Sequence, residues 1–175
     1  LRTACNTCVA GQYQDQNAQS SCKSNCNAGA YINDAKTACI NCVAGQYQDQ
    51  NDRSSCKSNC NAGSYINDAK TACNTCDTGQ YQDQNAQSSC KSNCNAGSSM
   101  NAAKTACVVC ARGQYQDQNA QSSCKTNCNA GSYMNSAKTA CNTCGTGQYQ
   151  DQNAKTSCKS NCFAGAYINP AKTAC

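Results

Sequence analysis

Cysteine recurs along this chain with a strict period of 34 residues, and this period limits what the chain can fold into. Each period reads C-x2-C-x13-C-x3-C-x12, and five full periods fit in the 175 residues. Repetition at a fixed spacing predicts a linear array of similar small units in place of one globular core. The cysteines in one phase of the repeat are Cys5, Cys39, Cys73, Cys107, Cys141 and Cys175.

Bulky apolar side chains are almost absent from the chain. It has one Leu, one Phe, no Trp, four Ile and four Val, whereas 21 of its 175 residues are Cys. Burial of so few large side chains cannot offset the conformational entropy that is lost on folding. We therefore expect cross-links through disulfides or metal ions to hold the fold together.

Each period divides into two similar halves. The segment from Cys8 to Cys22 aligns with the segment from Cys26 to Cys39, and both begin with C-x-x-G-x-Y. The glycine supplies an open backbone position, and the alternating residues after it indicate a short strand that a polar turn then reverses. No segment has a helical period. The predicted fold is small, disulfide-rich and mostly β or irregular, with ten hairpin half-units in an elongated rod.

The repeat boundaries follow from the cysteine phase. If the half-units stack at about 10 Å, the spacing of packed sheets, ten of them span on the order of 100 Å. The first and last repeats are as regular as the middle ones, although arrays usually end in atypical capping units, so we expect this chain to be a piece of a longer array. The five repeats are residues 5–38, 39–72, 73–106, 107–140 and 141–174, and residue 175 starts a further repeat.

The cysteine spacing fits two chemistries. C-x2-C and C-x3-C motifs separated by 13 residues resemble the ligand sets of all-cysteine zinc sites. Three features favour disulfides instead: His is absent, the two motifs join successive half-units, and the number of cysteines, 21, is odd. We expect disulfides, and we expect no metal or other cofactor.

The simplest disulfide scheme closes each C-x-x-G-x-Y loop on itself. This scheme leaves Cys5 without a partner in this chain, whereas the alternative of Cys5 with Cys22 and Cys8 with Cys26 leaves Cys175 over. In the first scheme the partner of Cys5 would belong to an upstream loop. The sequential pairs are Cys8 with Cys22, Cys26 with Cys39, Cys42 with Cys56, Cys60 with Cys73, Cys76 with Cys90, Cys94 with Cys107, Cys110 with Cys124, Cys128 with Cys141, Cys144 with Cys158, and Cys162 with Cys175.

One half-unit is not expected to be stable alone. Closure of a loop of about 15 residues contributes roughly 3 kcal/mol, while ordering its residues costs about 25 kcal/mol. Packing against neighbouring half-units must supply the difference, and Tyr is the largest side chain available for it. The tyrosines expected to pack in this way are Tyr13, Tyr31, Tyr47, Tyr65, Tyr81, Tyr115, Tyr133, Tyr149 and Tyr167.

Composition argues against several classes of function. The chain has no His and no Glu, so general acid–base chemistry is nearly absent and we expect no enzyme and no catalytic residue. Its longest apolar run, residues 106–111, is far shorter than a membrane span. The net charge of +5 comes from dispersed cations, which does not suggest a nucleic-acid partner. We expect Lys23, Lys36 and their copies to be solubilising charges, and Asp15 to Asn17 to be solvated rather than a calcium site.

The half-unit motif resembles known cysteine-rich modules. C-x-x-G-x-Y with a closing Cys, as at Cys8, Gly11, Tyr13 and Cys22, resembles the A-type module of tumour necrosis factor receptors and the related ephrin-receptor-like repeats. The alternation of C-x2-C and C-x3-C in an Asn-, Gln-, Ala- and Thr-rich chain is also similar to the immobilisation antigens that coat ciliated protists. The receptor modules imply elongated, extracellular rods of hairpins, with each loop closed by its own disulfide.

Near-identical units suit a polymer with equivalent lateral contacts. We therefore expect a structural extracellular protein that forms a segment of a disulfide-stabilised filament or coat at the cell surface. We expect it to self-associate through an outward row of glutamines, Gln12, Gln14, Gln16 and their copies. The alternative is a cysteine-rich receptor or antigen ectodomain that binds a ligand, since Ser99-Met100 and Phe163 break the repeat. An ice-binding solenoid that uses Thr37 and its copies is a third, weaker alternative.

Glycans are expected to be O-linked if the chain carries any. No Asn-x-Ser/Thr sequon occurs in the sequence, whereas Ser and Thr such as Thr7 and Ser20 are plentiful. Bound or covalent glycans are therefore compatible with the coat interpretation.

Overall fold

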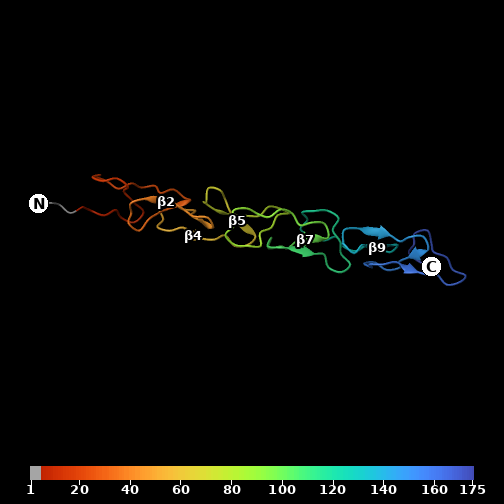
Figure 1. Cartoon of the computed structure of the whole chain (residues 1–175). Helices are drawn as coiled ribbons and strands as arrows, with labels where there is room; N and C mark the ends of the chain where they lie inside the picture. The colour runs from red at the N-terminus through yellow and green to blue at the C-terminus, as the bar shows by residue number, and fades with distance from the viewer. Residues whose placement is uncertain (1–4) are drawn as a thin grey trace. The chain divides into compact units, whose positions relative to one another are not determined.

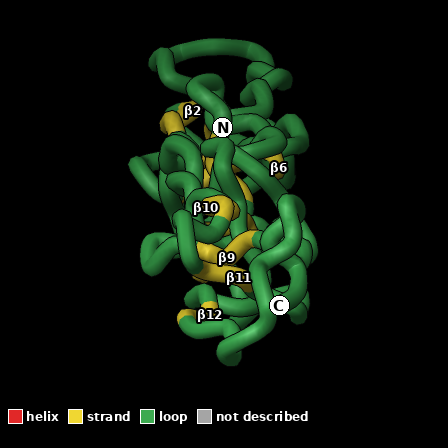
Figure 2. The backbone as a smooth tube through the Cα atoms, turned by 90° about the vertical axis from the view of Figure 1, so that its right-hand side faces the viewer, coloured by secondary structure: helices red, strands yellow, loops and turns green. Residues whose placement is uncertain are grey.

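A computed structural model describes residues 5–175. These residues form no helix, and short antiparallel strand pairs alternate with turns and irregular segments. Figure 2 shows the strands as brief stretches of a chain that is otherwise loop. The architecture is a small, disulfide-rich fold of strands and irregular structure, which confirms the fold class predicted from the sequence.

Contacts divide the chain into two compact units. The first comprises the chain up to Cys76 together with Gln82–Cys90, and the second comprises Asp77–Tyr81 together with Lys91–Cys175. The strands from β1 (Ala30–Ile32) to β6 (Cys73–Thr75) belong to the first unit, and those from β7 (Ser98–Met100) to β12 (Lys159–Ser160) belong to the second (Figure 1). The loop between Cys76 and Cys90 contributes residues to both units.

Each loop is closed by its own disulfide. The paired Cα atoms lie 5.4–5.8 Å apart in all ten bonds. The ten bonds are those of the sequential scheme, and Cys5 is exposed and forms no disulfide within residues 5–175. We call the five loops of the Cys8–Cys22 type first loops, and the five loops of the Cys26–Cys39 type second loops.

Four of the second loops contain an antiparallel pair of three-residue strands. In the register of the first pair, Tyr31 lies opposite Ile40, and Ile32 lies opposite Cys39, which is one of the two cysteines of the closing disulfide. The pairs are β1 (Ala30–Ile32) with β2 (Cys39–Asn41), β5 (Ser64–Ile66) with β6 (Cys73–Thr75), β7 (Ser98–Met100) with β8 (Cys107–Val109), and β9 (Ser132–Met134) with β10 (Cys141–Thr143).

The first loops form shorter pairs between the residues around Tyr and the Lys-Ser that follows the closing cysteine. The pairs are β3 (Gln46–Tyr47) with β4 (Lys57–Ser58) and β11 (Gln148–Tyr149) with β12 (Lys159–Ser160). The other three first loops make a single bridge at the same place, Tyr13 to Lys23, Tyr81 to Lys91 and Tyr115 to Lys125.

An asparagine side chain shapes the turn between the strands of each second loop. Asn33 Oδ1 accepts a hydrogen bond from the amide of Thr37 at 2.8 Å, and Asn33 Nδ2 donates to Thr37 Oγ1 at 2.9 Å. Such local bonds let a short polar side chain replace backbone partners in a turn. The Thr hydroxyl is thus part of the turn, which weakens the ice-binding alternative. The same pair of bonds recurs at Asn67, Asn101, Asn135 and Asn169.

The buried side chains differ from the expected row of tyrosines. Tyr13 packs against Cys26, Ala30 and Ile32, but the tyrosines are only half-buried, and Tyr167 is 80% exposed. The most fully buried apolar side chains are instead of two kinds. One kind directly follows the Tyr position of a second loop, and the other is the first cysteine of a loop. These are Ile32, Ile66, Met100 and Met134, and Cys26, Cys42, Cys60, Cys76, Cys94, Cys110, Cys128 and Cys144.

Candidate functional site

Each second loop docks onto the first loop that follows it through repeated backbone hydrogen bonds. The amide of Gly131 donates to the carbonyl oxygen of Gln150 at 2.7 Å, and the amide of Ala154 donates back to the carbonyl oxygen of Cys128 at 2.8 Å. Both units of the chain therefore contain the same loop-to-loop interface. The glycine bond recurs at 2.7 Å from Gly29 to Gln48, from Gly63 to Gln82 and from Gly97 to Gln116.

An asparagine of the first loop completes this interface. Asn51 Oδ1 accepts a hydrogen bond from the amide of Ala28, in the preceding second loop, at 2.8 Å. The Asn in the recurring Asp-Gln-Asn sequence thus joins two loops and is not a solvated strand end. The equivalent bonds, also of 2.8 Å, are Ala62 to Asn85, Ala96 to Asn119 and Ala130 to Asn153.

Four of the five first loops are in turn each joined to the second loop that follows. The amide of Gln116 donates to the carbonyl oxygen of Lys138 at 2.9 Å, and Lys138 Nζ donates to the carbonyl oxygen of Cys110. This corrects the interpretation of Lys36 and its copies as solubilising charges, because these side chains tie two loops together. The same two bonds join Lys36 with Gln14 and Cys8, Lys70 with Gln48 and Cys42, and Lys172 with Gln150 and Cys144.

Glycine is required where loops of the same type approach one another. Gly131 has a φ of +84°, and a Cβ built on it would lie 2.5 Å from the carbonyl oxygen of Ala171 in the next second loop. In the first loops, a Cβ on Gly113 would lie 2.9 Å from the Cβ of Ala154. A residue with a side chain would therefore suffer both backbone strain and a steric clash at either position.

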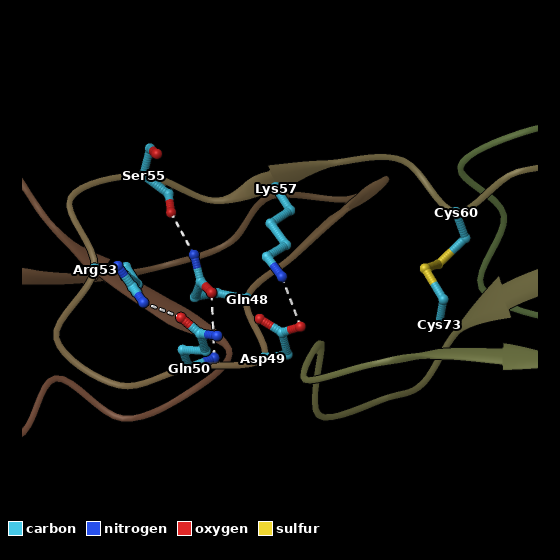
Figure 3. A network of polar contacts seen from close by, with 8 residues as sticks. All are labelled: Gln48, Asp49, Gln50, Arg53, Ser55, Lys57, Cys60 and Cys73. Carbon is cyan, nitrogen blue, oxygen red and sulfur yellow. Dashed lines mark hydrogen bonds and ion pairs between the residues drawn. A yellow bond between two sulfur atoms is a disulfide. The ribbon is translucent and has the colours of Figure 1, made fainter.

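The central glutamine is buried in four of the five first loops and half-buried in the remaining one, at Gln14, contrary to the prediction of an outward row of three glutamines. Gln48 is 3% exposed; its Nε2 donates to the carbonyl oxygen of Ser55 at 2.7 Å, and its Oε1 accepts from the amide of Gln50 at 3.2 Å (Figure 3). The segment is too short and too curved to keep alternate residues on one outer face, because its loop closes within 14 residues. The same bonds bury Gln82, Gln116 and Gln150.

We predict that Gln116→Ala destabilises the oxidised chain by about 1–3 kcal/mol, because it removes a buried side chain together with the two hydrogen bonds that this side chain makes to the backbone. Gln118→Ala is the matched control, since Gln118 is an exposed glutamine in the same loop, and we expect a change within about 0.5 kcal/mol. Urea unfolding under non-reducing conditions measures both. Equal effects of the two substitutions would refute the structural role of Gln116.

A Tyr–Lys–Asp set recurs on the surface of the first loops. Lys57 Nζ lies 2.6 Å from an Asp49 carboxylate oxygen and 5.8 Å from the centroid of the Tyr47 ring. The hydrogen bond from lysine holds the pKa of Asp15, Asp49, Asp117 and Asp151 below its ordinary value of 3.8. Comparable ion pairs join Lys23 with Asp15, Lys125 with Asp117, and Lys159 with Asp151.

These exposed pairs predict a weak dependence of stability on pH. The lowered carboxylate pKa values mean that the pairs stabilise the fold above pH 3.8, and that this contribution disappears as the pH falls through the lowered values. Because exposed pairs contribute little, we expect the oxidised chain to keep its fold at pH 2. Circular dichroism at pH 7 and pH 2 checks this, and cooperative unfolding between pH 4 and pH 2 would contradict it.

A surface recess recurs where three successive loops meet in the first unit. One copy, of about 350 Å³, lies among Gly11, Ile32, Asp34, Lys36 and Arg53. The second copy, of about 440 Å³, is lined by the residues 34 positions later, including Gly45, Ile66, Asp68, Lys70 and Gln87. The recess is therefore a feature of the repeat, and its charge depends on the residues that each repeat supplies.

The sequence indicated the cysteine pairs much more clearly than it indicated the residues that join the loops. Cysteine spacing indicated the pairs, whereas Gln48, Asn51 and their copies looked like ordinary polar residues. Their strict recurrence in every repeat was the one signal that set them apart from the variable Ile40 and Asn41. Ser99-Met100 and Phe163, the divergent positions, form no common surface: Met100 is buried and Phe163 is 87% exposed.

Within residues 5–175 no group of three or more His, Cys, Asp or Glu side chains is placed to hold a metal ion. The same residues contain no helix that is long and apolar enough to cross a membrane. No protein-family model matches the chain, and no curated protein is significantly similar to it in sequence.

Proposed function

We propose that this chain is a structural segment of a disulfide-stabilised extracellular filament or coat. The observation that carries the proposal is the recurrence of one interface: the amide of a second-loop Gly donates to the carbonyl of a first-loop Gln at 2.7 Å in four places. Equivalent contacts in every repeat are what a load-bearing or covering array needs.

The interface is of the head-to-tail kind. A second loop presents amides of residues such as Gly131 and Ala130, whereas the following first loop presents the Gln150 carbonyl and the Asn153 side chain. Because the two contacting surfaces differ, repeats can be added indefinitely without closing the array. This favours an extended assembly over a closed oligomer.

The disulfides support an extracellular site of action. Ten bonds in a chain with so few large apolar side chains would be lost in a reducing cytosol, and such bonds persist in secreted and surface proteins. The exposed amides of the first loops then offer lateral contacts. These are Gln16, Gln50, Gln84, Gln118 and Gln152, one in each repeat, and amides both donate and accept hydrogen bonds toward a neighbouring copy or a glycan.

Electron microscopy of the purified chain tests the proposal. We expect filaments or sheets that disperse in dithiothreitol. Replacement of the five exposed glutamines by Glu should disperse them without unfolding the chain, because it places like charges on every repeat, whereas Gln→Asn at the same five positions should preserve them. A monomer that forms no assembly and binds a soluble protein through one repeat would favour the receptor alternative.

A further inference from the structure

Positive charge is concentrated in the last two repeats. In repeats 1, 2 and 3 the number of Asp equals the number of Lys plus Arg, whereas repeats 4 and 5 each have three cations and one Asp. The cations of residues 107–174 are Arg112, Lys125, Lys138, Lys155, Lys159 and Lys172, and the acids are Asp117 and Asp151.

The fold brings three of these cations together from three successive loops. Gly113 and Ala154 lie so close together that a Cβ built on Gly113 would be 2.9 Å from the Cβ of Ala154. Arg112 directly precedes Gly113, and Lys155 directly follows Ala154. Lys138 Nζ donates to the carbonyl oxygen of Cys110, two residues before Arg112. The backbone at Arg112 and Lys155 and the ammonium of Lys138 therefore lie near one another in the second unit, as the equivalent residues do where they line one recess of the first unit.

Within residues 107–174, each of the two carboxylates is paired with another lysine. Asp117 is held by Lys125 at 2.6 Å, and Asp151 by Lys159 at 2.7 Å. Lys155 adds to the lowering of the Asp151 pKa, but as the weakest of its causes, after the hydrogen bond from Lys159. Arg112 and Lys155 are exposed and Lys138 is half-buried, so all three can face a ligand.

The same positions in the earlier repeats lack this excess of charge. In the first recess they are Ala10 and Lys36 of repeat 1 and Arg53 of repeat 2, and this recess also contains Asp34 and Asp52. Ser136 of repeat 4 and Ala154 of repeat 5 stand at the positions of those two acids. Compared with the first recess, the equivalent place in the second unit thus has one more cation and lacks both carboxylates, while the loops around it are the same.

We propose that Arg112, Lys138 and Lys155 form a binding site for an acidic polysaccharide that carries sulfate or carboxylate groups. The Arg guanidinium binds planar or tetrahedral oxyanions with two parallel hydrogen bonds, and the Lys138 ammonium keeps donors beyond the one it gives to Cys110. A polysaccharide fits better than a nucleic acid because no aromatic side chain lines the equivalent recesses, so bases would have no stacking surface.

Binding of the oxidised chain to dextran sulfate, with unsulfated dextran as reference, tests this site. Arg112→Ala and Lys155→Gln introduce the residues that repeats 1 and 3 carry at these positions, Ala10 and Gln87, so the fold should be preserved. Each should weaken binding by about two- to fivefold at low salt, the range expected for one exposed ion pair, and the double variant by about the product. Arg53→Gln removes the same single charge from repeat 2 and should leave the affinity unchanged.

Three results would overturn the proposal. They are equal binding to sulfated and unsulfated dextran, an effect of Arg53→Gln as large as that of Arg112→Ala, and tighter binding to single-stranded DNA than to dextran sulfate, which would indicate a nucleic-acid site. The site does not depend on filament formation, since the measurement uses the dispersed chain, and its failure would leave the proposed structural function untouched.

Discussion

Complete reduction and alkylation of the ten disulfides is expected to unfold the chain at 25 °C. Each loop of about 15 residues loses roughly 3 kcal/mol of closure stabilisation. The buried Ile32, Ile66, Met100 and Met134 supply only about 1.5–3 kcal/mol each, far too little to order a chain of this length. Hydrogen exchange measures the result, because the amides of Gly97 and Gly131 should lose all protection.

The oxidised chain at high salt is the control for this prediction. Its ion pairs are exposed, so salt should weaken them without loosening the loops. Retention of protected Gly97 and Gly131 amides in the alkylated chain would contradict the view that disulfides, and not side-chain burial, hold this fold.

The second large effect is expected from Gly131→Ala. The substitution forces Ala into a φ of +84° and places its Cβ 2.5 Å from the carbonyl oxygen of Ala171. The left-handed conformation costs about 1–2 kcal/mol, and the backbone shift that relieves the clash adds about 1–3 kcal/mol. Urea unfolding of the oxidised chain should show the sum of the two costs.

Gly165→Ala separates these two costs. Gly165 occupies the same position in the last second loop, with a φ of +88°, but nothing lies within 4 Å of its built Cβ. It should therefore show the backbone cost alone. Equal destabilisation by Gly131→Ala and Gly165→Ala would mean that the close approach of one second loop to the next contributes nothing to stability.

Much of the local structure could be predicted from the sequence because its determinants lie close together in the chain. The cysteines at 13- or 14-residue separations close single loops, and the C-x-x-G motif provides a positive φ at glycine in every loop. The absence of helical periodicity agrees with the absence of helices in residues 5–175. The short antiparallel pairing within these loops follows from the same spacing.

The contacts between loops could not be predicted, because their hydrogen-bonding partners lie 19 to 28 residues apart and depend on how neighbouring loops dock. Alternation placed Gln14 on an outer face with Gln12 and Gln16, but its copies from Gln48 onward are buried by the curvature of the closed loop. Likewise, the ammonium of Lys36 looked solvated until the fold placed the Cys8 carbonyl beside it.

The cluster of cations in the second unit could not be predicted from the sequence either, because its members lie in different loops. A search for runs of cations finds none in this sequence, yet Arg112, Lys138 and Lys155 come from three loops that dock on one another. In a repeat protein, charge is therefore better compared at equivalent positions of successive repeats than along the sequence. That comparison reveals the missing acids at Ser136 and Ala154 directly.

The central claim is that the repeats form a segment of an extended array. Small-angle X-ray scattering of the dispersed, oxidised chain tests this claim most directly. Ten half-units at about 10 Å each make a rod on the order of 100 Å long, for which we predict a radius of gyration of about 29 Å. A value near 16 Å, which a compact domain of this length has, would contradict the filament account.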